Sequence, residues 1–512
     1  MRTGEVTTTE RRPRTWLSWL AWLPALLLVA AAVSPLVLHW LGNVDDQRLV
    51  DLDVYRTGGA AILEGRSVYG FVTPAPQLLP FTYPPVAALL ATPLAAMSWT
   101  AAQWAWTALI FLTLAITVRL SFRALLGGAR TAPGTPDGGP VPPPAVLDER
   151  AVPGTPALPG TSPGGTEAAP ASSTPAGSAA RAARPARGVR ALLSGPVGFS
   201  GPVGLGDAGA TSEAGGASEA GGTGRLWTPL LFAALMIACT YLMPIRDQVR
   251  FGQVDILLVA LCLADCVARR PVWPRGMLIG LATAVKLTPG VFLIYLLIAG
   301  FGPGARREQR GTFLVAALTA ALLTLLPFLV IPADAADFWF RALLDPERLG
   351  ANAATTNQSM RGMLIRLYLP DALTSLLWAA LVAVVAWYGF RYARRALLDG
   401  HLVAGTALVG LMAVLLSPVA WIHHLAWVVV VLGALAGDGR DPVRLRVAAG
   451  VWLYYVLPIP WWGVTIKAAE IPVLSPVLGK IVQNGFGLGA LALVWLLGVW
   501  LPRRRETFQA LS

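Results

Sequence analysis

Long apolar runs, each bounded by a cluster of arginines, constrain this chain more than any other feature of its sequence. The first extends from Trp16 to about Val37, and similar runs recur as far as Leu501. A helix needs about 20 mostly apolar residues to cross a bilayer, and basic residues gather at its cytoplasmic end. The pattern therefore predicts an all-α polytopic membrane protein with about twelve transmembrane helices.

The composition agrees with a membrane location, which we expect to be the plasma membrane. Of the 512 residues, 55% are hydrophobic and only 13% are charged, whereas about a quarter are charged in a soluble protein. Much of the net charge of +12 comes from the arginine clusters that flank apolar runs, so it does not indicate nucleic-acid binding. Twelve crossings, with arginines inside, place both termini in the cytoplasm.

Residues 127–224 differ in composition from the rest of the chain. Pro, Gly, Ala and Ser dominate them, as in Val141-Pro-Pro-Pro144, and such a segment cannot bury enough apolar surface to offset chain entropy. We expect a disordered, low-complexity cytoplasmic insertion. It divides the chain into residues 1–126, with the first spans and an outward loop over 41–85, and residues 225–512, with the remaining transmembrane helices.

One apolar run, from Gly276 to Gly300, has two interpretations. It carries Lys286 and Pro289 near its centre, and arginines flank it on both sides. The first interpretation is a short broken hairpin that turns near Lys286, where the irregular backbone would have to be buried in protein or line a cavity. The second is a single proline-kinked span with a snorkelling lysine.

The first outward loop holds the most unusual polar residues between apolar runs. Asp51 and Asp53 lie just past the first predicted span, where a carboxylate is costly unless it is solvated, paired or used. The loop is either an ordinary solvated segment or the place of a catalytic base. Asp51 and Asp53 are therefore the candidate catalytic residues.

The predicted topology brings further polar side chains to this outward side. Arginine offers phosphate a fork of donors and lysine a point charge, and a carboxylate near a hydroxyl can act as a general base. A cavity with these groups would suit an anionic lipid-phosphate donor and a hydroxyl acceptor. We expect no cofactor and find no convincing metal-ligand spacing, although Asp51 and Asp53 could hold a divalent ion weakly. The candidates for binding the phosphate or sugar of the donor are Tyr55, Arg56, Tyr83, Arg246, Arg250, Gln253, Lys286, His423 and His424.

Several short motifs together carry a family resemblance. They are Asp51-x-x-Val-Tyr55, Gly65-x-x-x-Tyr69, Pro80-Phe-Thr-Tyr-Pro-Pro85, Phe251-Gly-Gln253, Gly280-Leu-Ala-x-x-x-Lys-Leu-Thr-Pro289 and Ser417-Pro-x-x-Trp-x-His-His424. In combination they resemble glycosyltransferase family 87, the actinobacterial polyprenol-phosphate-mannose-dependent alpha-1,2-mannosyltransferases. The long insertion departs from the family pattern, as does Asp255, where Asn often follows Gly-Gln-Val. Neither departure is expected to touch the chemistry.

The resemblance implies the GT-C fold, with an extracytoplasmic active site in the first outward loop. It implies transfer of mannose from polyprenyl-phosphate-mannose to a glycolipid or lipoglycan acceptor among membrane lipids, by one inverting displacement. Asp51 would take the acceptor proton, in preference to Asp53, because it fits the family's acidic position. The candidates for stabilising the leaving phosphate are Arg246, Arg250, Lys286 and His424.

Three alternatives remain open. One is a transferase that uses polyprenyl-phosphate-arabinose, another is a flippase of lipid-linked sugars, and the third is a non-catalytic assembly factor that acts through residues 127–224. The acceptor also remains open among phosphatidylinositol mannosides, lipomannan, lipoarabinomannan and other wall glycans.

Overall fold

The computed structural model describes residues 22–43, 48–128, 220–345, 348 and 350–511. The chain divides into two units, residues 135–216 and the remainder, and the described residues belong to the second. Most of the predicted insertion lies outside them. Its two ends differ from the prediction, because residues 127–128 and 220–224 are helical.

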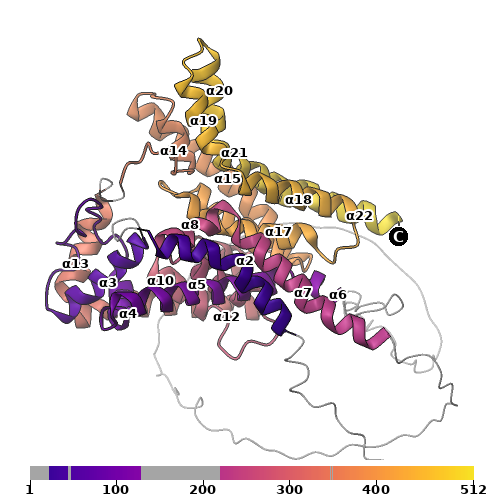
Figure 1. The fold of residues 1–512 in the computed structure, drawn as a ribbon, viewed down its shortest axis with the longest axis horizontal. Helices are drawn as coiled ribbons and strands as arrows, with labels where there is room; N and C mark the ends of the chain where they lie inside the picture. The colour runs from indigo at the N-terminus through magenta and orange to yellow at the C-terminus, as the bar shows by residue number, and fades with distance from the viewer. Residues whose placement is uncertain (1–21, 44–47, 129–219, 346–347, 349, 512) are drawn as a thin grey trace, which may run out of the picture. The chain divides into compact units, whose positions relative to one another are not determined.

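The described part of the chain is almost entirely helical (Figure 1), as the sequence predicts. Its first half contains α2 (Leu23–Leu41), α3 (Val50–Leu63), α4 (Pro85–Ala95), α5 (Trp99–Ser121), α6 (Arg123–Gly128), α7 (Ala220–Thr240), α8 (Met243–Phe251), α9 (Asp255–Val267), α10 (Met277–Val285), the 3-10 turn η2 (Thr288–Gly290) and α11 (Val291–Phe301). Its second half contains α12 (Arg307–Val330), α13 (Pro332–Phe340), η3 (Ala342–Leu344), α14 (Met360–Ile365), α15 (Asp371–Leu398), α16 (Leu402–Leu415), η5 (Ile422–Trp427), α17 (Val428–Ala436), α18 (Pro442–Val456), α19 (Ile459–Ala468), α20 (Leu474–Gln483), α21 (Gly485–Trp495), η6 (Leu496–Trp500) and α22 (Leu501–Leu511).

Five helices in the described ranges are long and apolar enough to cross a membrane: α2, α5, α12, α15 and the continuous stretch Gly485–Ala510. Two bent pairs, α7 with α8 and α18 with α19, would bring the number to seven. Pro244 and Pro458 stand at these bends, because proline cannot continue the hydrogen-bond ladder of a helix. A multi-pass helical protein is thus confirmed, while the twelve crossings and the GT-C arrangement stay predictions.

The run around Lys286 is a hairpin. Gly276, just before α10, lies against Thr312 near the start of α12, and Gly300, near the end of α11, lies against Gln309 one turn away. Both ends of the run therefore meet the same end of α12, and the chain reverses over residues 286–290. The hairpin interpretation is confirmed and the single kinked span is wrong.

The predicted outward loop contains a regular helix, α3, which carries both candidate carboxylates in its first turn. Acidic side chains at this position face the positive end of the helix dipole. The backbone N–H of Leu49 donates to the carbonyl of Arg250 at 3.1 Å and so ties the start of α3 to α8. Gly59 allows α3 to approach the backbone of α4 at Ala91. The candidate base therefore sits on a packed helix.

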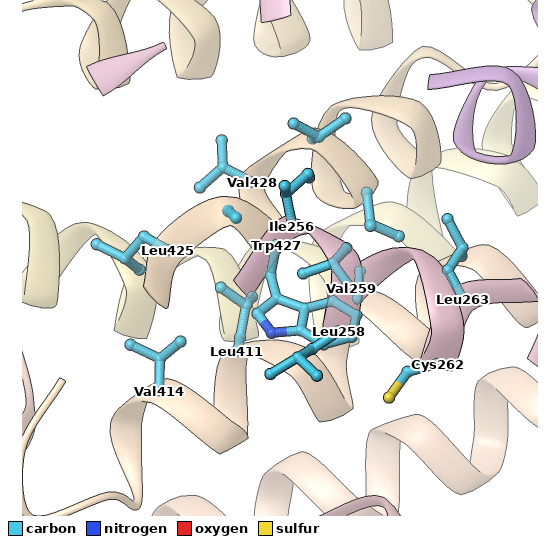
Figure 2. Packing of buried hydrophobic residues seen from close by; sticks show 14 of the residues in the cluster. Ile256, Leu258, Val259, Cys262, Leu263, Leu411, Val414, Leu425, Trp427 and Val428 are labelled. Atoms are coloured by element: carbon cyan, nitrogen blue, oxygen red, sulfur yellow. The ribbon is translucent and has the colours of Figure 1, made fainter. Parts of the chain in front are cut away.

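A dense apolar core holds the elements that meet near these carboxylates. Figure 2 shows side chains of α9, α16, η5 and α17 in this core, with Trp427 among them. Trp427 stacks on Phe292 of α11 with ring centroids 5.3 Å apart, and Gly410 leaves room for the indole. This packing fixes the first residue of α9 and the start of η5.

Candidate active site

Two tyrosines and a glutamine connect α3 to the turn between α8 and α9. The hydroxyls of Tyr55 and Tyr83 lie 2.9 Å apart, and the Gln253 Oε1 lies 3.3 Å from each of them. Gly252 ends α8 with φ +72°, and a Cβ there would press on Leu52. Glycine thus makes the tight turn that aims Gln253 at the tyrosines.

Asp51 lies at the edge of this group and is partly buried. Burial raises the pKa of its carboxyl to about 7, although a hydrogen bond with Gln253 and the charge of Lys286 both act to lower it. The nearby negative charge of Asp255 adds to the increase. A carboxylate with a pKa near neutrality is suited to accept a proton from a hydroxyl.

Lys286, at the tip of the hairpin, forms a buried ion pair with Asp255, the first residue of α9. Its Nζ lies 2.7 Å from the Asp255 Oδ1, and the two side chains are only 12% and 8% exposed. The same Nζ lies 3.0 Å from the Nε2 of His424 and 5.4 Å from the centre of the Tyr83 ring. The lysine therefore joins three elements and the tyrosine group in one cluster.

Two polar atoms of this cluster lack a partner. The Oδ2 of Asp255 and the Nε2 of His423 are buried and make no hydrogen bond with the described residues. They lie 3.8 Å apart, and the Nε2 of His424 lies 3.9 Å from the same oxygen. Buried polar atoms without a partner are uncommon, and here they collect at one point.

Asp255, His423 and His424 could in principle hold a metal ion, because one ligand atom from each lies within 4.8 Å of the others. Lys286 already places a positive charge within hydrogen-bond distance of two of these three groups. A divalent ion would have to displace that ammonium or strip its proton. We therefore assign the cation of this cluster to Lys286.

Two of the predicted residues, Asp53 and Arg56, face a different cavity. They line it with Arg48 and Trp99, and its volume is about 330 Å³. Burial raises the pKa of Asp53, and the charge of Arg56 partly offsets that increase. Asp51 and Asp53 are neighbours in the sequence but belong to separate environments.

Arg246 and Arg250 likewise lie apart from the Lys286 cluster. They line a second cavity of about 330 Å³ with Trp40 and Trp461. The guanidinium of Arg250 lies 5.0 Å from the centre of the Trp40 ring, in a cation–π contact. Of the predicted residues, the structure thus brings together the group of Asp51, Tyr55, Tyr83, Gln253, Lys286, His423 and His424.

The sequence interpretation missed Asp255. It was not among the predicted site residues and was expected not to touch the chemistry, but the structure places it in contact with Lys286 and close to both histidines. One signal was present in the sequence. Asp255 stands two residues after Gln253 and begins an apolar helix, where a charged residue demands a partner.

These features define a helical membrane protein with a buried acid–cation cluster beside a titratable carboxylate. The chain belongs to glycosyltransferase family 87, whose model matches residues 81–148 and 212–418. It is therefore a membrane glycosyltransferase. The matched ranges include Tyr83, Gln253, Asp255 and Lys286 but neither Asp51 nor the histidine pair.

Curated relatives agree with the family. The chain is 30% identical to the "Polyprenol-phosphate-mannose-dependent alpha-(1-2)-phosphatidylinositol mannoside mannosyltransferase" of Mycobacterium tuberculosis, over 80% of this chain and 76% of that protein. It is 30% identical to the protein of the same name from Mycolicibacterium smegmatis, over 94% of this chain and 91% of that one. A pentamannoside mannosyltransferase of Mycobacterium tuberculosis is 31% identical over 45% of this chain and 51% of that protein. No solved structure matches.

Proposed function

We propose that this enzyme transfers a mannosyl residue from polyprenyl-phosphate-mannose to a phosphatidylinositol mannoside or a related lipid-linked glycan on the extracytoplasmic face. The names of the two relatives matched over most of their length support this donor and this acceptor. One observation carries the mechanism. A carboxylate whose pKa is about 7 stands on a packed helix, hydrogen-bonded to Gln253 and close enough to the buried Lys286 to feel its charge.

In this mechanism Asp51 is the general base. It removes the proton from an acceptor hydroxyl while the hydroxyl oxygen attacks the anomeric carbon of the mannose. The bond between that carbon and the phosphate oxygen breaks, and its electron pair leaves with polyprenyl phosphate. Because the donor of this class is beta-linked, one displacement yields an alpha-linked product.

The cationic side of the cluster would stabilise the leaving phosphate. A phosphate is already a competent leaving group, so it needs fixed positive charge and donors more than a proton. Lys286 and His424 lie within hydrogen-bond distance of each other, and the Lys286 Nζ lies 5.4 Å from the centre of the Tyr83 ring. Tyr55, Tyr83 and Gln253 would hold Asp51 in place and contact the sugar.

The test is transfer by the purified protein in lipid, with polyprenyl-phosphate-mannose and polyprenyl-phosphate-arabinose offered separately and the linkage of the product analysed. We expect an alpha-1,2-mannosyl product from the first donor and none from the second. Asp51→Asn should lower the rate by about 10²–10⁴-fold, while Asp53→Asn, the matched control on the same helix, should keep it. Arabinosyl transfer, or movement of donor across vesicles without a glycosidic product, would overturn the proposal.

A further inference from the structure

Among the described residues, Asp255 is the one acidic side chain in direct contact with Lys286, the cation of this cluster. Its Oδ1 accepts a hydrogen bond from Lys286. Its Oδ2 lies 3.8 Å and 3.9 Å from the Nε2 atoms of His423 and His424 and has no hydrogen-bond partner within the described part of the chain. A carboxylate would be expected to repel the phosphate that Lys286 and His424 are proposed to bind. Its presence at this point therefore calls for a function.

We propose that Asp255 is a positioning residue that holds Lys286 and the histidine pair in place for the donor phosphate. After the transfer, its negative charge allows the product polyprenyl phosphate to leave. The inference rests on the proposed function, because it assigns a role within the same site. Asp255 touches neither the sugar nor the reacting carbon in this scheme, and it acts through Lys286.

The positioning part follows from where the two groups sit. Lys286 has a flexible four-carbon stem and lies where the hairpin turns, so its Nζ needs an anchor. Asp255 supplies one from the first turn of α9, and the Ile256 N–H beside it faces the Oε1 of Gln248 at 3.4 Å. The Nε2 of Gln248 donates to the His423 carbonyl at 2.8 Å. One short segment thus orders the lysine and the start of η5 together.

The unpartnered Oδ2 explains how the lysine can change partners. When a phosphate draws the ammonium of Lys286 away, the carboxylate of Asp255 would lose its closest contact. The Nε2 of His423, which has no hydrogen-bond partner among the described residues, lies 3.8 Å from this oxygen, so a small rotation supplies a replacement in the tautomer that carries a hydrogen on this nitrogen. The site can therefore exchange one hydrogen-bond arrangement for another without leaving a buried charge alone.

The release part follows from the charges. The donor is a phosphodiester with one negative charge, whereas the product is a phosphate monoester that carries up to two, since its second pKa is about 6. The paired Asp255 and Lys286 are neutral together. If Asp255 were neutral, the uncompensated Lys286 would bind the product more strongly than the donor, and turnover would be limited by release. Removal of one charge at this range should change the affinity by about tenfold or more.

The test is Asp255→Asn, which keeps the size of the side chain and an oxygen that can accept from Lys286. We would measure kcat, the KM for donor and the inhibition constant of short-chain polyprenyl phosphate. We expect product inhibition to become about tenfold tighter, the donor KM to fall less, and kcat to fall. An unchanged or weaker inhibition constant would overturn the inference.

Asp265→Asn is the matched control on the same helix. Its carboxylate accepts hydrogen bonds from the N–H groups of Gly276 and Ile279, away from the cluster. This variant should therefore give a lower yield of folded protein but keep the product inhibition constant of the wild type. Equal tightening in both variants would also overturn the inference. If Asp255→Asn does not fold, Asp255→Ser supplies a second neutral side chain suited to the first turn of a helix. A wild-type protein inactive with every donor would instead contradict the proposed function.

Discussion

Asp51→Asn should separate catalysis from folding stability in this enzyme. The substitution removes the carboxylate but keeps the size of the side chain and an amide that can hydrogen-bond to Gln253. It should abolish most transfer, as expected for a general base. It should also make the folded protein more stable above neutral pH, because the wild-type protein holds an ionised carboxylate in a poorly solvated place there.

The size of the stability effect follows from the pKa of Asp51. Burial raises that pKa from 3.8 to about 7, so the unfolded chain loses its proton near pH 4 while the folded chain keeps it to about pH 7. Folding therefore loses stability as the pH rises between these values and stays less stable above them. At about 1.4 kcal/mol for each pKa unit, full burial would cost about 4 kcal/mol. Because the side chain is only partly buried, we expect about 2 kcal/mol.

The assay is thermal unfolding of the purified wild-type and Asp51→Asn proteins at pH 8 and near pH 4.5, together with transfer activity at pH 8. We expect a higher unfolding midpoint for the variant at pH 8 and nearly equal midpoints at the acid pH, with transfer lowered by about 10²–10⁴-fold. Activity within tenfold of the wild type, or a variant less stable at pH 8, would refute this reasoning. Asp53→Asn should retain activity under the same conditions.

Three further predictions follow from the same geometry. The transfer rate of the wild type should rise through about pH 7 as Asp51 ionises, and a rate that does not change between pH 5 and pH 8 would contradict the assignment of the base. Gly276→Val should destabilise the hairpin by about 2–4 kcal/mol, because φ is +99° and a Cβ would collide with Thr312. The yield of folded protein measures this loss of stability. Gly304→Val is the control and should lose less stability, because φ is +76° but the space around the glycine is open. Leu63 on α3 is 62% exposed, and a cysteine in its place should react with a membrane-impermeant thiol reagent in intact cells. Val272 is 98% exposed, and a cysteine in its place should react only after the cells are permeabilised. The reverse pattern would place the site in the cytoplasm.

Periodicity and residue type predicted much of the fold. The apolar runs predicted helices, and the first of them, from Trp16 to about Val37, overlaps α2 (Leu23–Leu41). The hairpin at Lys286 was one of two interpretations, because a lysine and a proline within an apolar run are compatible with a turn or a kink. Only the contacts of α10 and α11 with α12 decide between them.

The separation of Asp51 from Asp53 shows where proximity in the sequence misleads. Side chains two residues apart on an α-helix point in nearly opposite directions, so one faces Lys286 and the other faces Arg56. As long as the segment was interpreted as a loop, both carboxylates were candidates for the base, and only the family resemblance favoured Asp51. Once the segment is helical, they cannot share one site.

The sequence by itself determined that this chain is a helical membrane protein and that it resembles family 87. It also made Asp51 and Lys286 candidate site residues. Only the tertiary structure showed that Asp255 completes the cluster and that Arg246 and Arg250 lie elsewhere. The physical reason is distance along the chain. Lys286 lies 31 residues from Asp255 and 138 from His424, and whether such groups meet depends on how α9, the hairpin and η5 pack, which no local pattern of residues encodes.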